Sequence, residues 1–218
     1  MIVNGWLDWA IKWPGKSTFT YAGTNQVKGV FLHSAEGYRE YLLNHSVNGP
    51  LSWHFTNMLN GEFYQHHPIT ARCWHATAAN FDYLGCENEG VGDKSLNPVP
   101  DPTLTEPQIQ NAVHLIQELE LYTGKKASRN WPLPQFLSLC EHNEVTRIGG
   151  TPTACPSGRI PWQTILTRLE TMPTNQDKIN ALLALAHFIR NGWNLNDLSD
   201  FDIAAIEAAV EEMRQAQQ

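Results

Sequence analysis

The sequence has few basic residues and no long apolar run. Lys and Arg number 15 against 22 Asp and Glu, so the 218-residue chain has a formal net charge of −7. Nucleic acids and anionic membranes are bound through clustered basic side chains, so we expect neither as a partner. No stretch reaches the roughly 20 apolar residues of a membrane span, and the first residues lack a signal-peptide pattern. We therefore expect a protein that is made in the cytoplasm without a signal peptide.

Cysteine is also scarce, and its spacing is uninformative for structural metal sites. The four cysteines are Cys73, Cys86, Cys140 and Cys155. They form no CxxC pair, which argues against a zinc knuckle, and a chain without a signal is not expected to carry a disulfide framework. Buried apolar packing is the ordinary expectation for a free cysteine. We expect Cys155 to differ, because it lies in a loop between Pro152 and Pro156.

Tryptophan is abundant, with eight residues in the chain. Most are expected in the core, but Trp also lines grooves that bind sugars or peptides.

Hydrophobic periodicity predicts an α/β fold in which helices flank a central mixed β-sheet. An apolar run with β-branched residues predicts a strand at 27–34, and further strands are predicted at 51–59, 62–66, 83–91 and 136–139. Helical periods predict helices at 35–44, 105–123 and 161–170. Asn60-Gly61 is a hairpin signal between two of the strands. Thr105 and Gln108 form a capping-box pattern at the start of the second helix, and Gly124 marks its end.

The two ends of the chain differ from this pattern. Residues 1–26 show no clear period and are interpreted as an ordered arm. After residue 172, two amphipathic helices are predicted at 175–191 and 199–216. We therefore expect a catalytic domain at 1–172 and a C-terminal helical segment at 173–218. Two helices alone bury little apolar surface, so this segment is expected to bind the substrate polymer or to pair two copies as a homo-oligomer.

The chain has nine histidines, which differ in their sequence context. A lone His is usually structural, which is our expectation for His45, His114 and His187 in helical sequence. His66 and His67, at a strand end, are expected to face solvent or a groove.

His33 and His142 are different, because each follows a short apolar strand. Together with Cys155 they would supply the three protein ligands of a catalytic zinc, which keeps an open position for water. Their separation in the sequence makes spacing alone a weak argument.

Six segments carry a family resemblance. VFLHSAEG, SWHFTNMLNGEFYQ, CWHATAAN, GCENEGVG, EHNEV and TACPSG occur in this order between about residues 27 and 170. In order and spacing they resemble the type 2 N-acetylmuramoyl-L-alanine amidase family. That family includes phage lysozyme-type amidases, bacterial recycling amidases and animal peptidoglycan recognition proteins. The resemblance implies peptidoglycan as the substrate and Zn²⁺ as the cofactor.

The resemblance also implies roles for single residues. It makes His33, His142 and Cys155 the zinc ligands, and Glu87 the acid that activates the attacking water. It places His75 in the substrate groove close to the metal, where it or Glu87 returns a proton to the leaving amine. The other substrate-binding residues implied are Trp53, His54, Trp74 and Asn80.

Two positions depart from the family pattern. Trp53 stands where many lysozyme-type members have Tyr, and Thr153 stands two residues before the metal-binding Cys, where Lys is common. Trp lacks a hydroxyl for the oxyanion, so Thr153 or a backbone N–H is expected to take that role.

The functions that remain open are a phage or prophage endolysin, a cytoplasmic recycling amidase for anhydromuropeptides, and a peptidoglycan-binding module without catalysis. Cys155 argues against the last, and an endolysin, acting on the wall after release, is the preferred reading.

Overall fold

A computed structural model describes residues 1–35, 37, 39–90, 103–156, 158–171 and 206. The chain divides into two compact units, Met1–Ile165 and Leu166–Gln218. The predicted helices at 175–191 and 199–216, the loop at 97–102 and His187 lie outside the described residues, apart from Ile206. The role of segment 173–218 therefore stays a prediction. None of the helices in the described part of the chain combines the length and apolar character needed to cross a membrane.

The elements alternate between short strands and helices along the chain. In chain order they are β1 (Ile2–Val3), β2 (Trp6–Leu7), β3 (Ile11–Lys12), the 3₁₀ helix η1 (Ser17–Phe19), β4 (Thr20–Tyr21), β5 (Gly29–Ala35), α1 (Arg39–Asn48), β6 (Phe55–Asn57), β7 (Phe63–Gln65), β8 (Arg72–Cys73), η2 (Thr77–Phe81), β9 (Tyr83–Glu89), α2 (Glu106–Thr123), β10 (Ala127–Ser128), β11 (Leu137–Glu141), η3 (His142–Ile148) and α3 (Trp162–Thr171).

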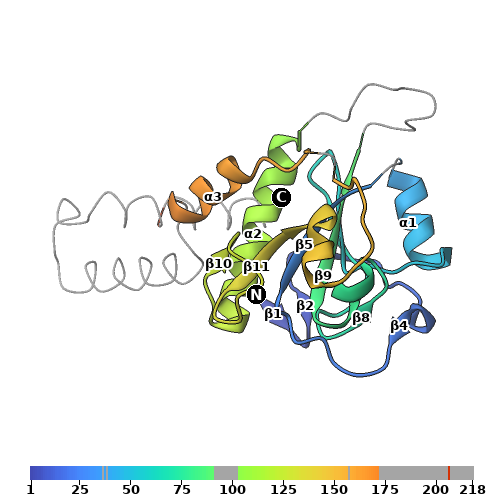
Figure 1. Ribbon diagram of the computed structural model, residues 1–218. Helices are drawn as coiled ribbons and strands as arrows, with labels where there is room; N and C mark the ends of the chain where they lie inside the picture. Colours follow the sequence, from blue (N-terminus) through green and yellow to red (C-terminus); the bar gives the residue numbers. More distant parts are fainter. Residues whose placement is uncertain (36, 38, 91–102, 157, 172–205, 207–218) are drawn as a thin grey trace, which may run out of the picture. The chain divides into compact units, whose positions relative to one another are not determined.

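A seven-stranded mixed sheet forms the centre, with strand order β10-β11-β5-β9-β6-β7-β3. Its central strands β11, β5, β9 and β6 are parallel, while β6 and β7 form the antiparallel hairpin predicted around Asn60-Gly61. In Figure 1 strands β5 and β9 of this sheet lie between α1 and α2. The predicted α/β fold with a central mixed sheet is therefore confirmed.

The long helix α2 begins and ends as its sequence predicts. The Thr105 hydroxyl accepts the Gln108 backbone N–H, the Gln108 side chain closes the capping box, and Gly124 takes the left-handed conformation with φ 67°. Helix α1 begins four residues later than predicted, at Arg39, and extends to Asn48.

Register assigns the two faces of the sheet. His33 pairs with Glu87, and Glu87 pairs with Thr56, so these three side chains project to one face. Tyr64 pairs with Thr56 and lies on that face too, where Leu43 of α1 packs against it. Helix α1 and the predicted zinc ligands therefore share one face of the sheet.

The other face belongs to α2. Asn57 projects opposite to Thr56, and its side-chain amide donates to the Gln108 carbonyl at 2.8 Å. The Gln108 side-chain amide donates in return to the Asn57 and Glu89 carbonyls, both at 3.0 Å. These bonds hold α2 against the ends of β6 and β9, on the face of the sheet opposite to His33 and Glu87.

The N-terminal arm contributes more to the sheet than its sequence indicated. Strand β3 adds to β7 in parallel, and β1 with β2 and β4 with β8 form two small antiparallel pairs. Strands of two residues carry no detectable period, which is why residues 1–26 gave no strand signal.

His66 and His67 are buried, at 1% and 5% exposure, so the expectation that they face solvent or a groove was wrong. His66 Nδ1 donates to the Trp13 carbonyl at 2.8 Å, and its Nε2 accepts from the Thr56 hydroxyl at 2.7 Å. The same hydroxyl accepts the Trp53 indole N–H at 2.8 Å and can donate its own proton to Nε2, so this set of bonds is complete with a neutral His66. The ring ties the N-terminal arm to the sheet.

This bonding predicts acid instability. Burial lowers the pKa of His66 to about 4 from its ordinary value of 6.5. Since the unfolded chain takes up the proton first, the contribution of neutral His66 is complete above pH 6.5 and is lost as the pH falls toward 4. We expect a loss of about 2–3 kcal/mol in the free energy of unfolding from this residue. Urea denaturation at pH 7, 6, 5 and 4 measures it.

His66→Asn is the matched control, because its amide can still donate to the Trp13 carbonyl but does not titrate. It should be less stable than the parent at pH 7 and show a shallower dependence on pH. Equal slopes for parent and variant would contradict the assignment.

Candidate metal centre

The three predicted ligands meet at one point of the structure. The ligand atoms of His33, His142 and Cys155 all lie within 4.8 Å of one another. His33 is buried, whereas the other two are partly exposed, so the cluster opens on one side. Residues more than 100 positions apart are thus brought together by the parallel pairing of β5 with β11.

Each ligand leaves a different element at the same edge of the sheet. His33 lies near the end of β5, and His142 directly follows the end of β11. Cys155 comes from the loop after η3, and its carbonyl accepts the Asn143 backbone N–H at 2.6 Å. The carboxyl ends of adjacent parallel strands meet at one edge, which is why short strands can deliver separated ligands.

The Cys155 sulfur is held by the backbone of β5. The Ser34 N–H donates to Cys155 Sγ at 3.2 Å, an interaction that stabilises a thiolate. Arg159, four residues later, is only 3% exposed. Its guanidinium donates to the Ser34 hydroxyl at 3.0 Å and to the Asn88 and Glu89 carbonyls at 3.2 and 2.9 Å. Arg159 therefore fastens the cysteine loop to the ends of β5 and β9.

His75 makes a hydrogen-bonded chain behind His33. Burial lowers the pKa of His75 to about 4, so the ring is neutral. Its Nε2 lies 3.2 Å from the Tyr83 carbonyl and must donate to it, which leaves Nδ1 as an acceptor. His33 Nε2 lies 3.1 Å from that Nδ1 and therefore donates. This bonding fixes the tautomer of His33 and leaves its Nδ1 as the free acceptor atom.

The His75 ring is held tightly in place. It lies against Gly85 of β9, where an added Cβ would come within 2.6 Å of His75 Cγ. The Asn80 side-chain oxygen accepts the backbone N–H groups of His75 and Ala76 at 2.9 and 2.7 Å. Asn80, predicted to bind substrate, is 5% exposed and orders the loop that carries His75.

Glu87 lies beside the free nitrogen of His33. Its Oε1 is 3.6 Å from His33 Nδ1, and its side chain is 17% exposed. Burial raises the pKa of Glu87 to about 8. Burial, followed by the neighbouring His75 and His142, lowers the pKa of His33 well below its ordinary value. A neutral imidazole can offer a lone pair to a metal, and a carboxylate with a raised pKa is a stronger base.

Trp53 and His54 were predicted to bind substrate, and the structure encloses both. Trp53 is 4% exposed, and its ring N–H is already bonded to Thr56. His54 is 0% exposed; its Nδ1 accepts the Gly85 N–H at 3.1 Å and its Nε2 donates to the Ala71 carbonyl at 3.0 Å. The His54 ring joins the segment before β6 to β9, whereas Trp53 bonds within its own segment; direct contact of either residue with substrate stays a prediction.

Trp74 and Thr153 lie closer to the surface. Trp74 is half-buried, its ring 5.3 Å from that of Tyr21, and its backbone N–H donates to the Ser52 hydroxyl at 2.8 Å. The Thr153 hydroxyl accepts the Cys155 backbone N–H at 3.2 Å, so its own proton remains to be donated elsewhere.

The donor set fits zinc. Two neutral imidazole nitrogens and a thiol with a backbone donor at its sulfur are borderline-soft ligands of the kind that Zn²⁺ prefers. Donor atoms in a tetrahedral zinc site are about 3.3–3.8 Å apart, so only a small adjustment of these side chains is needed.

Two residues of this site were missed by sequence reasoning. Arg159 follows the TACPSG segment as a single basic residue in a loop, and nothing in its context signals burial. The Tyr83 carbonyl is a backbone group and leaves no sequence signal.

A mixed sheet that gathers two imidazoles, a thiol and a buried carboxylate at one strand edge defines an α/β protein with a candidate metal centre. The N-acetylmuramoyl-L-alanine amidase family, Amidase_2, matches residues 23–158. The chain belongs to this family, and it is an N-acetylmuramoyl-L-alanine amidase. No curated protein matches the sequence.

Several solved structures share the fold. The endolysin N-acetylmuramoyl-L-alanine amidase LysCS from Clostridium intestinale URNW is similar at 17% identity over 73% of this chain and 95% of that chain, with a TM-score of 0.51. Peptidoglycan recognition protein-LE, solved with tracheal cytotoxin, is similar at 14% identity over 74% of this chain and 94% of that chain, with a TM-score of 0.51. A selenomethionine derivative of AmpD is similar at 15% identity over 77% of this chain and 98% of that chain, with a TM-score of 0.50. At these identities the likeness establishes the fold.

Proposed function

We propose that the amidase is zinc-dependent and cuts the amide between the lactyl group of N-acetylmuramic acid and L-alanine in peptidoglycan. The observation that carries the proposal is the convergence of His33, His142 and Cys155 beside Glu87. Zinc bound by these three residues would lower the pKa of a coordinated water toward about 7 and polarise the carbonyl.

The remaining roles, which are proton transfer and stabilisation of the oxyanion, fall to side chains of the site. The Glu87 carboxylate accepts a proton from the attacking water as its oxygen bonds to the lactyl carbonyl carbon. Thr153 can donate a hydrogen bond from its hydroxyl to the carbonyl oxygen, on which negative charge develops. The C–N bond then breaks, and Glu87 returns its proton to the L-alanine amine. His75 is less suited to this transfer, because its Nε2–H is bonded to the Tyr83 carbonyl.

Digestion of purified peptidoglycan tests the proposal. We expect new free L-alanine amino termini by mass analysis of the products, their loss on chelation, and their return on addition of zinc. Release of reducing sugar ends would indicate a glycosidase and contradict the proposal, as would full activity in the presence of a chelator.

We further propose that the enzyme is a phage or prophage endolysin, which reaches the wall after release from the producing cell. Support comes from the resemblance of its motifs to lysozyme-type amidases and from the extra segment 173–218. Comparing the cleavage of intact wall sacculi with that of soluble anhydromuropeptides distinguishes an endolysin from a recycling amidase. An endolysin cuts both, whereas an enzyme that cuts only the soluble fragments is a recycling amidase.

The segment 173–218 is proposed to bind the wall or to pair two copies. Removing it and measuring sacculus pull-down and sedimentation tests this role. No change in either measurement would contradict it.

The His75 hydrogen bonds predict an effect on metal binding. His75→Leu removes the acceptor for His33 Nε2, so the His33 tautomer is no longer fixed. Loss of such an outer ligand contact lowers metal affinity by about 10–100-fold. Competition for zinc with a chromophoric chelator measures the change.

His75→Asn is the matched control, because its amide oxygen can occupy the position of Nδ1 and accept from His33. It should keep most of the zinc affinity. Equal affinity in the parent and in His75→Leu would show that His75 does not hold His33 for the metal.

A further inference from the structure

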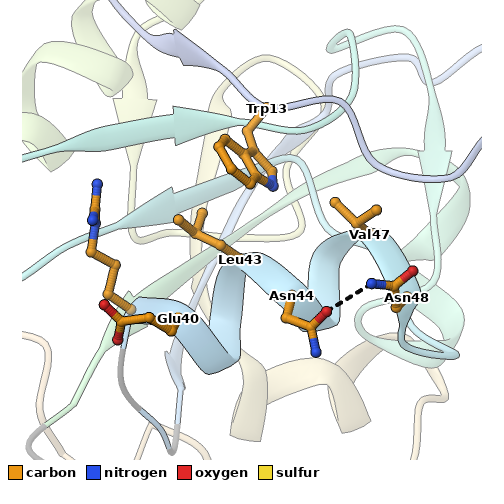
Figure 2. A pocket seen from close by; sticks show the side chains of 7 residues that line it. Trp13, Glu40, Leu43, Asn44, Val47 and Asn48 are labelled. Atoms are coloured by element: carbon orange, nitrogen blue, oxygen red, sulfur yellow. Dashed lines mark hydrogen bonds between the residues drawn. The ribbon is translucent and has the colours of Figure 1, made fainter.

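A pocket with a volume of about 390 Å³ lies between the N-terminal arm and helix α1. In Figure 2 the Trp13 ring lies above the helix and faces Leu43, while Val47 is placed further along. Asn44 and Asn48 also line the pocket and are joined by a 2.7 Å hydrogen bond from Asn48 Nδ2 to Asn44 Oδ1. This volume lies within the range of small-molecule sites, about 300–1,000 Å³.

The pocket is separate from the metal centre. His45 of α1 stacks on Trp53, at a centroid distance of 5.9 Å. Val47 is two residues on, and at 3.6 residues per turn its side chain is rotated by about 200° from His45. His45 and the pocket-lining Val47 therefore lie on different sides of α1, and none of His33, His142 and Cys155 lines the pocket.

Trp13 is exposed yet held in a fixed position. Its side chain is 42% exposed, although a Trp gains more than any other residue from burial. Its backbone N–H donates to the Gln65 carbonyl at 2.9 Å, and its carbonyl accepts from His66. Its ring stands at 89° to that of Tyr64, with centroids 6.2 Å apart. A fixed, exposed indole over a pocket is a platform for a flat apolar surface.

The charges around the pocket favour a neutral ligand. The Arg39 guanidinium is paired with Glu62 at 2.8 Å and is bonded to the Tyr64 hydroxyl, so its charge is compensated. Glu40 remains as a carboxylate on the lining and repels anions such as the stem peptide of peptidoglycan. The bonded amides keep Nδ2 of Asn44 as a donor and Oδ1 of Asn48 as an acceptor.

We propose that this pocket binds a neutral pyranose of the glycan strand, an N-acetylglucosamine unit rather than the peptide-bearing sugar. A pyranose has an apolar C–H face that stacks on an indole, and a polar edge of hydroxyl and acetamide groups that amides bind. The proposal rests on peptidoglycan being the substrate. A second hold on the same polymer raises the effective concentration of the scissile bond at the metal centre.

Binding of chitotetraose to the full chain in the presence of a chelator tests this. Because no cleavage is needed, its outcome is independent of the proposed zinc chemistry. Titration by calorimetry and by the chemical shifts of the indole N–H should give a dissociation constant of about 1 mM or tighter. Trp13→Ala should weaken binding at least tenfold. Asn44→Ala, on an exposed helix position, should weaken it about threefold without affecting the fold.

Tyr122→Ala removes another exposed aromatic, 49% exposed on α2, and should bind as the parent does. Equal binding by Trp13→Ala and the parent would overturn the proposal. So would preference for a free stem peptide, or self-association that Trp13→Ala abolishes, since either would assign the pocket to another occupant.

Discussion

Glu87→Gln is expected to lower the turnover of peptidoglycan by about 10²–10⁴-fold, the usual contribution of a general base. The amide has the same shape as the carboxylate but cannot accept a proton from water. Glu87 is suited to this role by position, with Oε1 3.6 Å from His33 Nδ1, and by burial, which raises its pKa to about 8. Initial rates of L-alanine amino-terminus release from sacculi measure the loss.

The matched control is Glu89→Gln, on the same strand. The Glu89 carboxylate accepts the Leu59 backbone N–H at 2.8 Å, which the amide oxygen of Gln can also do. The activity of Glu89→Gln should stay within about threefold of that of the parent. The zinc content of Glu87→Gln should equal that of the parent, which separates loss of the base from loss of the metal. More than a tenth of parental activity in Glu87→Gln would rule out Glu87 as the base.

The central elements of the fold could be predicted because their signals are local. The β5 segment follows an apolar run, and α2 carries its own capping box and terminal glycine. The two-residue strand β3 could not be predicted, because it is defined by pairing with β7 and not by its own sequence. The burial of His66 is likewise set by a partner 53 residues away, the Trp13 carbonyl.

The residues of the site also differ in whether they could be predicted from the sequence. The ligands His33, His142 and Cys155 could be proposed because their residue types and flanking strands are written in the sequence. The partners that orient them could not, because these are long-range contacts with backbone groups and with an isolated arginine. The Tyr83 carbonyl behind His75 and the Arg159 guanidinium at the cysteine loop are the two clearest cases. Trp53 illustrates a related point: its substitution for Tyr was visible, but only the structure bonds its N–H to Thr56.

Cys155→Ala is expected to abolish both zinc binding and activity. Removing one of three protein ligands leaves two imidazoles, and the sulfur that Ser34 N–H contacts at 3.2 Å is lost. Zinc bound to the folded state alone stabilises it by about 4 kcal/mol at a concentration 1,000 times the dissociation constant. The midpoint temperature of thermal unfolding of the parent should therefore rise on addition of zinc, while the midpoint temperature of Cys155→Ala should not. Activity should fall at least 10³-fold, because the activation of water and the polarisation of the carbonyl by the metal are lost together.

Two further variants separate ligand loss from loss of a thiol. Cys155→Asp restores an oxygen ligand that zinc accepts, so part of the zinc-dependent stabilisation and activity should return. Cys73→Ala removes a thiol that is 0% exposed and outside the cluster, so the zinc stoichiometry should be unchanged although the fold loses some stability. If Cys155→Ala bound zinc as tightly as the parent, the metal would have to be held by residues other than these three. Failure of Cys155→Asp alone would leave the ligand assignment intact and would mean that a thiolate, held by the Ser34 N–H, is required at this position.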